Sequence, residues 1–295
     1  MKINELFNNK ELVFSFEIFP PKVTSSISTI YNTLEELKDL KPDFISVTYG
    51  AGGSLTNNRT TELSSLVKEK YGVESVAHLT CISSTKEEID IILDDLKRKG
   101  VENILALRGD IPVGQDPKGD FKYAYELISH IKKRGDFNVL GACYPEGHVK
   151  GRDFKEDMLH LKLKEEMGAT QFISQLFFDN NYFYNMLEEK EKLGIKSPIQ
   201  AGIMPVVNKN QIERISSLCG AYVPEKFIKI MNKYEYDKDA LREAGIAYAV
   251  EQIVDLVSTG VDGIHLYTMN NPYVARRIHE NINTIINSIN NKKVV

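Results

Sequence analysis

The chain has 295 residues, of which 42% are apolar and 26% charged, as in an ordinary soluble globular protein of one or two domains. Its net charge of −4 gives no electrostatic basis for binding nucleic acid. No apolar run approaches the roughly 20 residues that span a bilayer, and residues 1–10 lack the apolar segment of a signal peptide. The three cysteines lie far apart without a CxxC pair, so we expect neither disulfides nor a structural zinc site, and a cytoplasmic location.

Apolar runs and turn residues divide the chain into alternating strands and helices. The predicted strands cover residues 12–19, 43–49, 74–80, a segment that begins at 103, 138–144, 170–178, 199–204 and 261–267. The predicted helices cover residues 25–40, 59–70, 85–99, 121–134, 153–167, 180–193 and 272–289. Two or three further helical segments are expected within residues 209–259.

The spacing of the predicted strands indicates the fold. The first seven strands begin 29 to 35 residues apart, and the last begins about twice as far from the seventh. Such even spacing corresponds to one βα unit per step. We therefore predict an α/β protein with a single (β/α)8 TIM barrel over residues 1–295 and extra helices between strands 7 and 8. The alternative, an open doubly wound sheet, normally has a GxGxxG turn after the first strand, which this sequence lacks.

Polar side chains stand at the ends of the predicted strands. They are Glu17, Thr48, His78, Arg108, Asp110, Tyr144, Glu146, His148, Gln175 and Tyr267. Because the active site of a barrel is built from the carboxyl ends of its strands, we expect these side chains to converge. For Arg108 and Asp110 the alternative is a surface ion pair beside the turn at Pro112.

Glu17 is the most informative of these residues. It lies within the aromatic segment Phe14–Phe19, where desolvation is expected to raise the pKa of its carboxyl group. A carboxylic acid that stays partly protonated near neutral pH can act as a general acid. The alternative is a buried structural carboxylate that pairs with a lysine or arginine.

The remaining polar positions are each open to two interpretations. His78 fits a hydrogen-bonding wall residue better than a metal ligand, because no second histidine and carboxylate stand at metal-ligand spacing, and we expect no metal. Gln175 suits recognition of a polar ring edge or a hydrogen bond inside the barrel. Asp157 and Lys164 share one face of a predicted helix, which by itself predicts a solvated surface.

Eight segments, in order along the chain, resemble the methylenetetrahydrofolate reductase family, flavin-dependent barrel enzymes of one-carbon metabolism. The segments are residues 16–21, 46–51, 77–81, 106–110, 144–148, 175–179, 202–205 and 266–270. The chain ends soon after the last predicted barrel helix, so it resembles the short bacterial type, without the C-terminal regulatory domain of eukaryotic relatives.

The resemblance implies that FAD binds without a covalent link at the carboxyl face of the barrel. The positions that match flavin contacts are Thr48, His78, Arg108, Gly109, Asp110, Tyr123, Ala124, Tyr144, His148, Asp157 and Lys164. It further implies a ping-pong scheme, in which NAD(P)H reduces the flavin and leaves before methylenetetrahydrofolate takes its place.

The resemblance also implies roles in the chemistry. Glu17 matches the general acid that protonates N10 of the folate, opening the ring to a 5-iminium cation that accepts a hydride and becomes 5-methyltetrahydrofolate. Asp110 matches a carboxylate near the flavin and the pterin. Gln175 and Gln211 match contacts to folate or nicotinamide, and Tyr267 is expected beside the substrate.

Some positions and alternatives leave parts of this scheme open. Asn271 stands where some family members have an arginine, which leaves open how the glutamate tail of the folate is bound. His160 and Leu163 stand where other members have polar or basic residues, which leaves open how the adenosine is bound. One alternative is a pterin-binding barrel that transfers methyl groups to a corrinoid. Another is a flavoprotein subunit that receives electrons from an iron–sulfur partner, because three cysteines are too few to hold a cluster here. We also expect a homo-oligomer.

Overall fold

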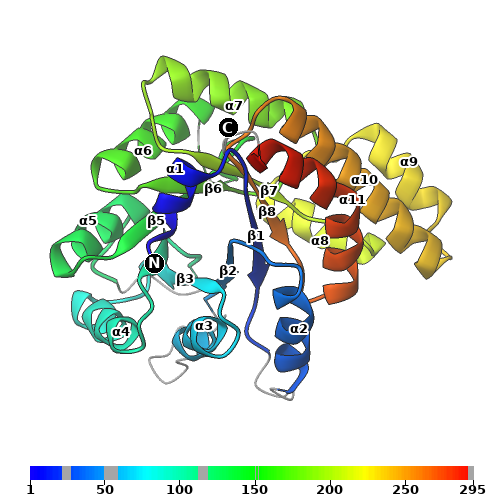
Figure 1. The fold of residues 1–295 in the computed structure, drawn as a ribbon. Coiled ribbons are helices and arrows are strands. Elements are labelled where there is room, and N and C mark those ends of the chain that lie inside the picture. The colour runs from blue at the N-terminus through cyan, green and yellow to red at the C-terminus, as the bar shows by residue number, and fades with distance from the viewer. Residues whose placement is uncertain (22–27, 50–58, 112–118, 150, 152, 292–295) are drawn as a thin grey trace.

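The computed structural model describes residues 1–21, 28–49, 59–111, 119–149, 151 and 153–291. Eight parallel strands close a barrel in chain order, with β1 paired to both β2 and β8 (Figure 1). The strands are β1 (Val13–Ile18), β2 (Phe44–Val47), β3 (Glu74–Thr80), β4 (Asn103–Leu107), β5 (Asn138–Cys143), β6 (Gln171–Ser174), β7 (Ile199–Ile203) and β8 (Gly263–Tyr267). The predicted barrel and its eight strands are confirmed.

Helices surround the barrel, and three of them form the predicted insertion between β7 and β8 (Figure 1). The helices are η1 (Ile3–Glu5), α1 (Leu6–Asn9), α2 (Ser28–Lys38), α3 (Arg59–Glu69), α4 (Lys86–Arg98), α5 (Ala124–Arg134), α6 (Phe154–Glu166), α7 (Asn180–Lys192), α8 (Lys209–Cys219), α9 (Glu225–Lys233), α10 (Lys238–Ser258) and α11 (Pro272–Asn291). None of the helices in the described ranges combines the length and apolar content that crossing a membrane requires.

Helix boundaries follow from local hydrogen bonding, as α4 illustrates. The Thr85 hydroxyl accepts the Glu88 N–H at 3.2 Å, and the Glu88 carboxylate accepts the Thr85 N–H at 2.9 Å. This capping box satisfies two backbone donors that the helix itself leaves free. The helix is followed by Gly100 at φ +66°, a left-handed conformation that glycine adopts readily.

Two details differ from the prediction. The sixth strand is predicted over residues 170–178 but ends at Ser174. Leu176 and Phe178 are apolar because they pack in a separate cluster with side chains of α8, α9 and α10, outside the sheet. The amino-terminal helices η1 and α1 have no counterpart in the prediction, since they are too short to show a helical period.

The amino-terminal segment packs against the amino ends of the strands. Ile3 is fully buried, and its N–H donates to Asn103 Oδ1 at 2.9 Å. Its apolar neighbours point into the barrel and are Val13, Phe44, Val76, Leu105, Leu140 and Ile173. Burying a side chain of this size stabilises the fold by roughly 1.5–3 kcal/mol. An apolar layer therefore fills the end of the barrel opposite the polar strand ends.

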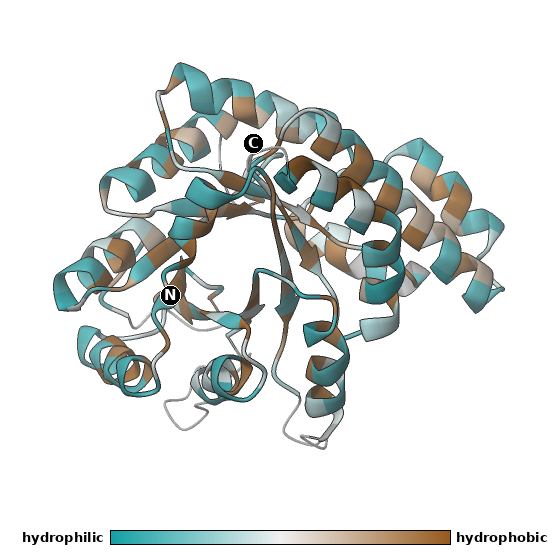
Figure 2. Cartoon of the chain, in the orientation of Figure 1, coloured by the Kyte–Doolittle hydropathy of each residue, from teal (hydrophilic) through white to brown (hydrophobic). Residues whose placement is uncertain are grey.

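Residues that alternate with the interior ones point outward and form the main core between strands and helices. Phe16, Ile45 and Leu79 are examples, and they pack with apolar side chains of the surrounding helices. Figure 2 shows apolar colour along the strands and on the helix sides that face them, with polar colour on the outer sides. The two-residue period of a strand thus separates a barrel interior from a helix-covered exterior.

Gly245 in α10 gives a test of this packing. A Cβ atom at this position would lie 1.8 Å from the carbonyl oxygen of Val206, so the insertion depends on close backbone approach. In an ordinary helix Gly→Ala stabilises by about 1 kcal/mol. We expect Gly245→Ala instead to lower the free energy of unfolding by about 1–3 kcal/mol in urea denaturation. Ala247→Gly, at an exposed position of the same helix, measures the effect of intrinsic helix propensity alone. A stabilised Gly245→Ala would contradict this packing.

Candidate active site

The carboxyl end of the barrel brings Glu17 next to two histidines. Glu17 Oε2 lies 3.5 Å from His78 Nε2 and 3.7 Å from His265 Nε2, and the Glu17 side chain is 19% exposed. In the strand register Glu17 stands between Ser46 and Tyr267. In the described part of the chain, the ionisable partners in contact with its carboxylate are these histidines and not a lysine or arginine. Glu17, His78 and Tyr267 therefore converge, and the alternative of a lysine- or arginine-paired carboxylate is not observed there.

His265 is a site residue that the sequence analysis misses. It is fully buried in the barrel, with Nδ1 2.7 Å from Ser15 Oγ and Nε2 3.3 Å from Ser46 Oγ. These contacts hold the imidazole plane in place between β1, β2 and β8. The signal for it is the alternation of β8, which puts His265 on the same face as Tyr267, two residues later.

The His78 ring forms part of the wall of the site and is uncharged at physiological pH. Its side chain is 7% exposed, and burial lowers its pKa to about 4, although the charge of Glu17 acts to raise it. Its Nε2 is buried and makes no hydrogen bond to the described residues. The Glu17 carboxylate lies 3.5 Å from this nitrogen, which is a long and weak contact for a buried polar atom.

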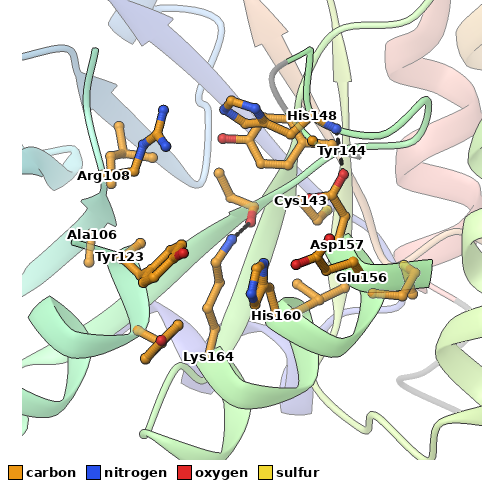
Figure 3. A pocket seen from close by; sticks show the side chains of 17 residues that line it. Ala106, Arg108, Tyr123, Cys143, Tyr144, His148, Glu156, Asp157, His160 and Lys164 are labelled. Carbon is orange, nitrogen blue, oxygen red and sulfur yellow. Dashed lines mark hydrogen bonds between the residues drawn. The ribbon is translucent and has the colours of Figure 1, made fainter. Parts of the chain in front are cut away.

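A cavity of about 440 Å³ adjoins the ends of β4 and β5, a size typical of small-molecule sites (Figure 3). Seven of the predicted cofactor contacts line it, and they are Arg108, Tyr123, Ala124, Tyr144, His148, Asp157 and Lys164. Figure 3 shows Asp157, His160 and Lys164 on α6, beneath Tyr144 and His148. These seven positions therefore line one pocket, and their role as flavin contacts stays a prediction.

Helix α6 sets the floor of the cavity. It begins after Asp153, whose carboxylate caps the Lys155 N–H at 3.1 Å. Lys164 Nζ donates to the Ala142 carbonyl at 2.7 Å and lies 5.6 Å from the centre of the Tyr144 ring. Burial lowers the pKa of Lys164 to about 8. The interpretation of Asp157 and Lys164 as a solvated helix face is therefore wrong, because this face turns toward the cavity and β5.

The loop after β5 forms another wall of the cavity. Tyr144 begins a β-turn with Pro145 as its second residue, and the Gly147 N–H closes this turn on the Tyr144 carbonyl at 3.1 Å. The His148 N–H then donates to Asp157 Oδ2 at 2.6 Å, which ties the loop to α6. The Tyr144 and His148 rings meet edge to face at 4.8 Å. Burial, together with the nearby Arg108 cation, lowers the pKa of His148.

An aromatic shelf at the cavity includes residues that the sequence analysis did not place in the site. Tyr123 and Tyr125 stack at 5.3 Å, and His160 lies 5.4 Å from Tyr123. All three line the cavity. Their approach depends on the packing of α5 against α6, so no local sequence period indicates it. A flat, stacked surface of this kind suits a planar ring system.

The other predicted site residues lie outside the lining of this cavity as far as the chain is described. Thr48 follows β2, and its N–H donates to the Ile18 carbonyl at 3.0 Å. Gly109 adopts φ +82° next to Thr80, and Asp110 follows it at an exposed position. These three strand-end positions share the carboxyl face of the barrel with Glu17.

Gln175 directly follows β6, and Gln211 belongs to the insertion. Gln175 Oε1 accepts the Leu176 N–H at 2.9 Å, so this amide oxygen satisfies the adjacent backbone. Gln211 lies in the first turn of α8, and its N–H donates to Asn208 Oδ1 at 3.2 Å. Tyr267 donates its hydroxyl to the Ser174 carbonyl at 2.6 Å. The expected Gly50–Ala51 segment and Pro112 fall outside the described residues.

The described residues contain no group of three or more His, Cys, Asp or Glu side chains that could hold a metal ion. Cys81 and Cys143 are buried, and burial raises the pKa of each thiol to about 12. Neither thiol is therefore activated, which is consistent with small core residues.

Comparison with known proteins identifies the family. A family model described as methylenetetrahydrofolate reductase matches residues 2–283. The chain belongs to this family. A 5,10-methylenetetrahydrofolate reductase from Pectobacterium carotovorum subsp. carotovorum is 34% identical over 256 residues, covering 87% of this chain and 85% of that protein. These values extend the methylenetetrahydrofolate reductase resemblance over nearly the whole barrel.

Other matches differ in length or sequence. Methylenetetrahydrofolate reductase (NADH) 1 from Arabidopsis thaliana is 33% identical over 284 residues, which cover 91% of this chain but only 48% of that protein. The chain thus spans about half the length of such relatives. An uncharacterized protein from Clostridium thermocellum that binds two copies of 5-methyl-5,6,7,8-tetrahydrofolic acid has a TM-score of 0.65 at 14% identity, covering 97% of this chain and 99% of that one. The match to the Clostridium thermocellum protein supports the fold.

The proton affinity of His78 gives a direct test of the site geometry. We expect its ring to titrate near pH 4 in NMR, well below the ordinary value of about 6.5. Because the Glu17 carboxylate raises this pKa, Glu17→Gln should move the midpoint lower still. His78→Asn identifies the resonance. A midpoint near 6.5, or an upward shift in Glu17→Gln, would contradict a buried His78 beside Glu17.

Proposed function

We propose that this protein reduces 5,10-methylenetetrahydrofolate to 5-methyltetrahydrofolate, with FAD as cofactor and NAD(P)H as electron donor. The observation that carries the proposal is the placement of Glu17 between His78 and His265, on the carboxyl face of a barrel that also carries a cavity lined by cations and aromatic rings, in a chain of this family. The C. thermocellum protein, which has a similar fold and binds 5-methyl-5,6,7,8-tetrahydrofolic acid, supports the proposal that this fold holds the product.

The residues of the cavity fit FAD. Arg108 and Lys164 supply positive charge for a diphosphate, and Tyr123, Tyr125 and His160 supply a flat surface for a ring. His78, which lies beside Glu17, would form part of the wall next to the flavin. Bound there, the flavin would supply the hydride chemistry, while the protein supplies binding, orientation and charge.

Glu17 would supply the proton. Its carboxyl group would transfer a proton to N10 of the folate, so that the ring opens to the 5-iminium cation. Contacts with Ser15 and Ser46 hold the His265 ring in place. This ring would limit the side from which the folate can reach Glu17. Neutral His78 adds no positive charge beside a cation that forms in the substrate. Asp110, at the same face, would add a negative charge that favours this cation.

The Tyr267 hydroxyl, Gln175 and Gln211 would form the folate side of the site. Tyr267 is fixed by its hydrogen bond to the Ser174 carbonyl and packs against the cluster under α8 to α10. Gln211 lies on α8, in the same insertion. A substrate would therefore bind between the loop after β5 and the insertion.

The first experiment is a visible absorption spectrum of the purified protein, followed by anaerobic addition of NADH and then of methylenetetrahydrofolate. We expect a flavin spectrum that bleaches with NADH and recovers with the folate. A flavin that ignores NADH but responds to a low-potential reductant would support the partner-dependent subunit. A colourless protein that cannot take up FAD would support the methyl-transfer barrel.

Glu17→Gln tests the acid. Flavin reduction by NADH should persist, because it needs no proton from Glu17, while folate turnover should fall by at least about 10²-fold, the usual scale of a general acid. Stopped-flow absorbance measures the two half-reactions separately. Glu69→Gln, an exposed position in α3, is the matched control. Near-normal folate turnover in Glu17→Gln would rule out this role.

The pKa of Lys164 predicts how cofactor binding depends on pH. Lys164 loses its proton as pH rises through about 8, and an anionic ligand then loses a charge partner. The dissociation constant of FAD should rise about tenfold between pH 7 and pH 9, as measured by quenching of FAD fluorescence. Lys164→Met should bind more weakly and lose this dependence, whereas Lys162→Met on the same helix should retain it. An unchanged pH profile in Lys164→Met would contradict the assignment.

A further inference from the structure

Glu146 stands between the two walls of the site and is not used in the chemistry described above. It lies in the β-turn after β5, between Tyr144 and His148, which both line the cavity. Its Oε2 atom reaches across to the connection between α8 and α9, where it accepts the Tyr222 N–H at 2.7 Å. One carboxylate therefore spans from the cofactor side of the site to the insertion.

The environment of Glu146 indicates a specific contact rather than a chance surface hydrogen bond. The carboxylate is half-buried, and burial raises its pKa, with the charge of Asp179 acting in the same direction. The Tyr222 N–H opposes this shift by stabilising the charged form. A carboxylate kept here against a desolvation cost and a neighbouring negative charge needs a compensating donor, which the backbone of residue 222 provides.

A second contact joins the same two segments. Gly220 ends α8 at φ +70°, and a Cβ atom there would lie 3.1 Å from Val149 Cγ2, so Val149 packs directly over this glycine. Next to it, Ala221 is buried in the apolar cluster of the insertion, against which Tyr267 and Cys219 also pack. The Glu146 hydrogen bond thus attaches the loop to a segment that is itself anchored in the core of the insertion.

We propose that Glu146 is a positioning residue that fastens the insertion to the loop after β5 and so sets the spacing between the cofactor wall and the substrate wall. The cofactor wall carries Tyr144 and His148, and the substrate wall carries Gln211 and Tyr267. The effect of Glu146 on kinetics rests on the proposed function, whereas the attachment of the insertion to the loop does not. Loss of the contact loosens the substrate wall while the cavity under Tyr144 retains its own hydrogen bonds to α6.

Hydrogen exchange tests the fastening without any assumption about activity. In Glu146→Ala, the amide of Tyr222 and its neighbours in residues 219–223 should exchange about tenfold faster than in the wild type. Glu146→Gln keeps an oxygen acceptor and should retain the protection. Glu188→Ala, an exposed position on α7, controls for loss of a surface glutamate. Equal exchange in the wild type and Glu146→Ala, or a Glu146→Gln that behaves like Glu146→Ala, would overturn the proposal.

Steady-state kinetics then separate positioning from general destabilisation. We expect Glu146→Ala to raise the KM for methylenetetrahydrofolate about tenfold while FAD content and the rate of flavin reduction by NADH stay near wild type, with rescue in Glu146→Gln. A fall in FAD content or in both half-reactions would identify a merely structural role. If Glu146→Ala does not fold, Glu146→Asp, shorter by one methylene, carries the same exchange test. A wild type without reductase activity would contradict the proposed function and leave the exchange result to decide on the fastening.

Discussion

The pairing of β1 with β8 is the constraint on which the rest of the structure depends. It closes the barrel, so every strand is hydrogen-bonded on both sides and all carboxyl ends face the same way. This closure aligns Glu17 with Tyr267 and brings His265 to the carboxylate from the opposite end of the chain. Without it, the polar residues at the strand ends would be a series of separate surface positions.

Inside the closed barrel, polar and apolar layers are divided along the axis. The amino ends are filled by Ile3 and its apolar neighbours, whereas further along the strands Ser15, Gln200 and His265 form a buried hydrogen-bonded group. Gln200 Nε2 donates to Ser15 Oγ at 2.9 Å, and Ser15 meets His265 at 2.7 Å. Because buried polar groups are costly unless they are hydrogen-bonded, this group orders the ring that faces Glu17.

Burial also shifts the pKa values of ionisable groups on both sides of the site. Burial lowers the pKa of His78 to about 4 and that of Lys164 to about 8, so one ring is neutral and one ammonium is readily neutralised. The insertion of α8, α9 and α10 contributes a second apolar cluster, which supports Tyr267 from behind. Neutral rings, a small number of cations and a separately packed wall are an arrangement suited to a flat anionic cofactor and a polar substrate.

The sequence by itself determined the number of strands, their spacing, the place of the insertion and the strand-end positions of residues such as Glu17 and Arg108. These features are local, since a two-residue period and a turn signal are readable within a few neighbouring residues. Only the tertiary structure decided that His265 meets Glu17, that Lys164 donates to β5, that Leu176 leaves the sheet and that Glu146 reaches Tyr222. Burial and contact between distant segments depend on barrel closure and helix packing, which no local pattern encodes.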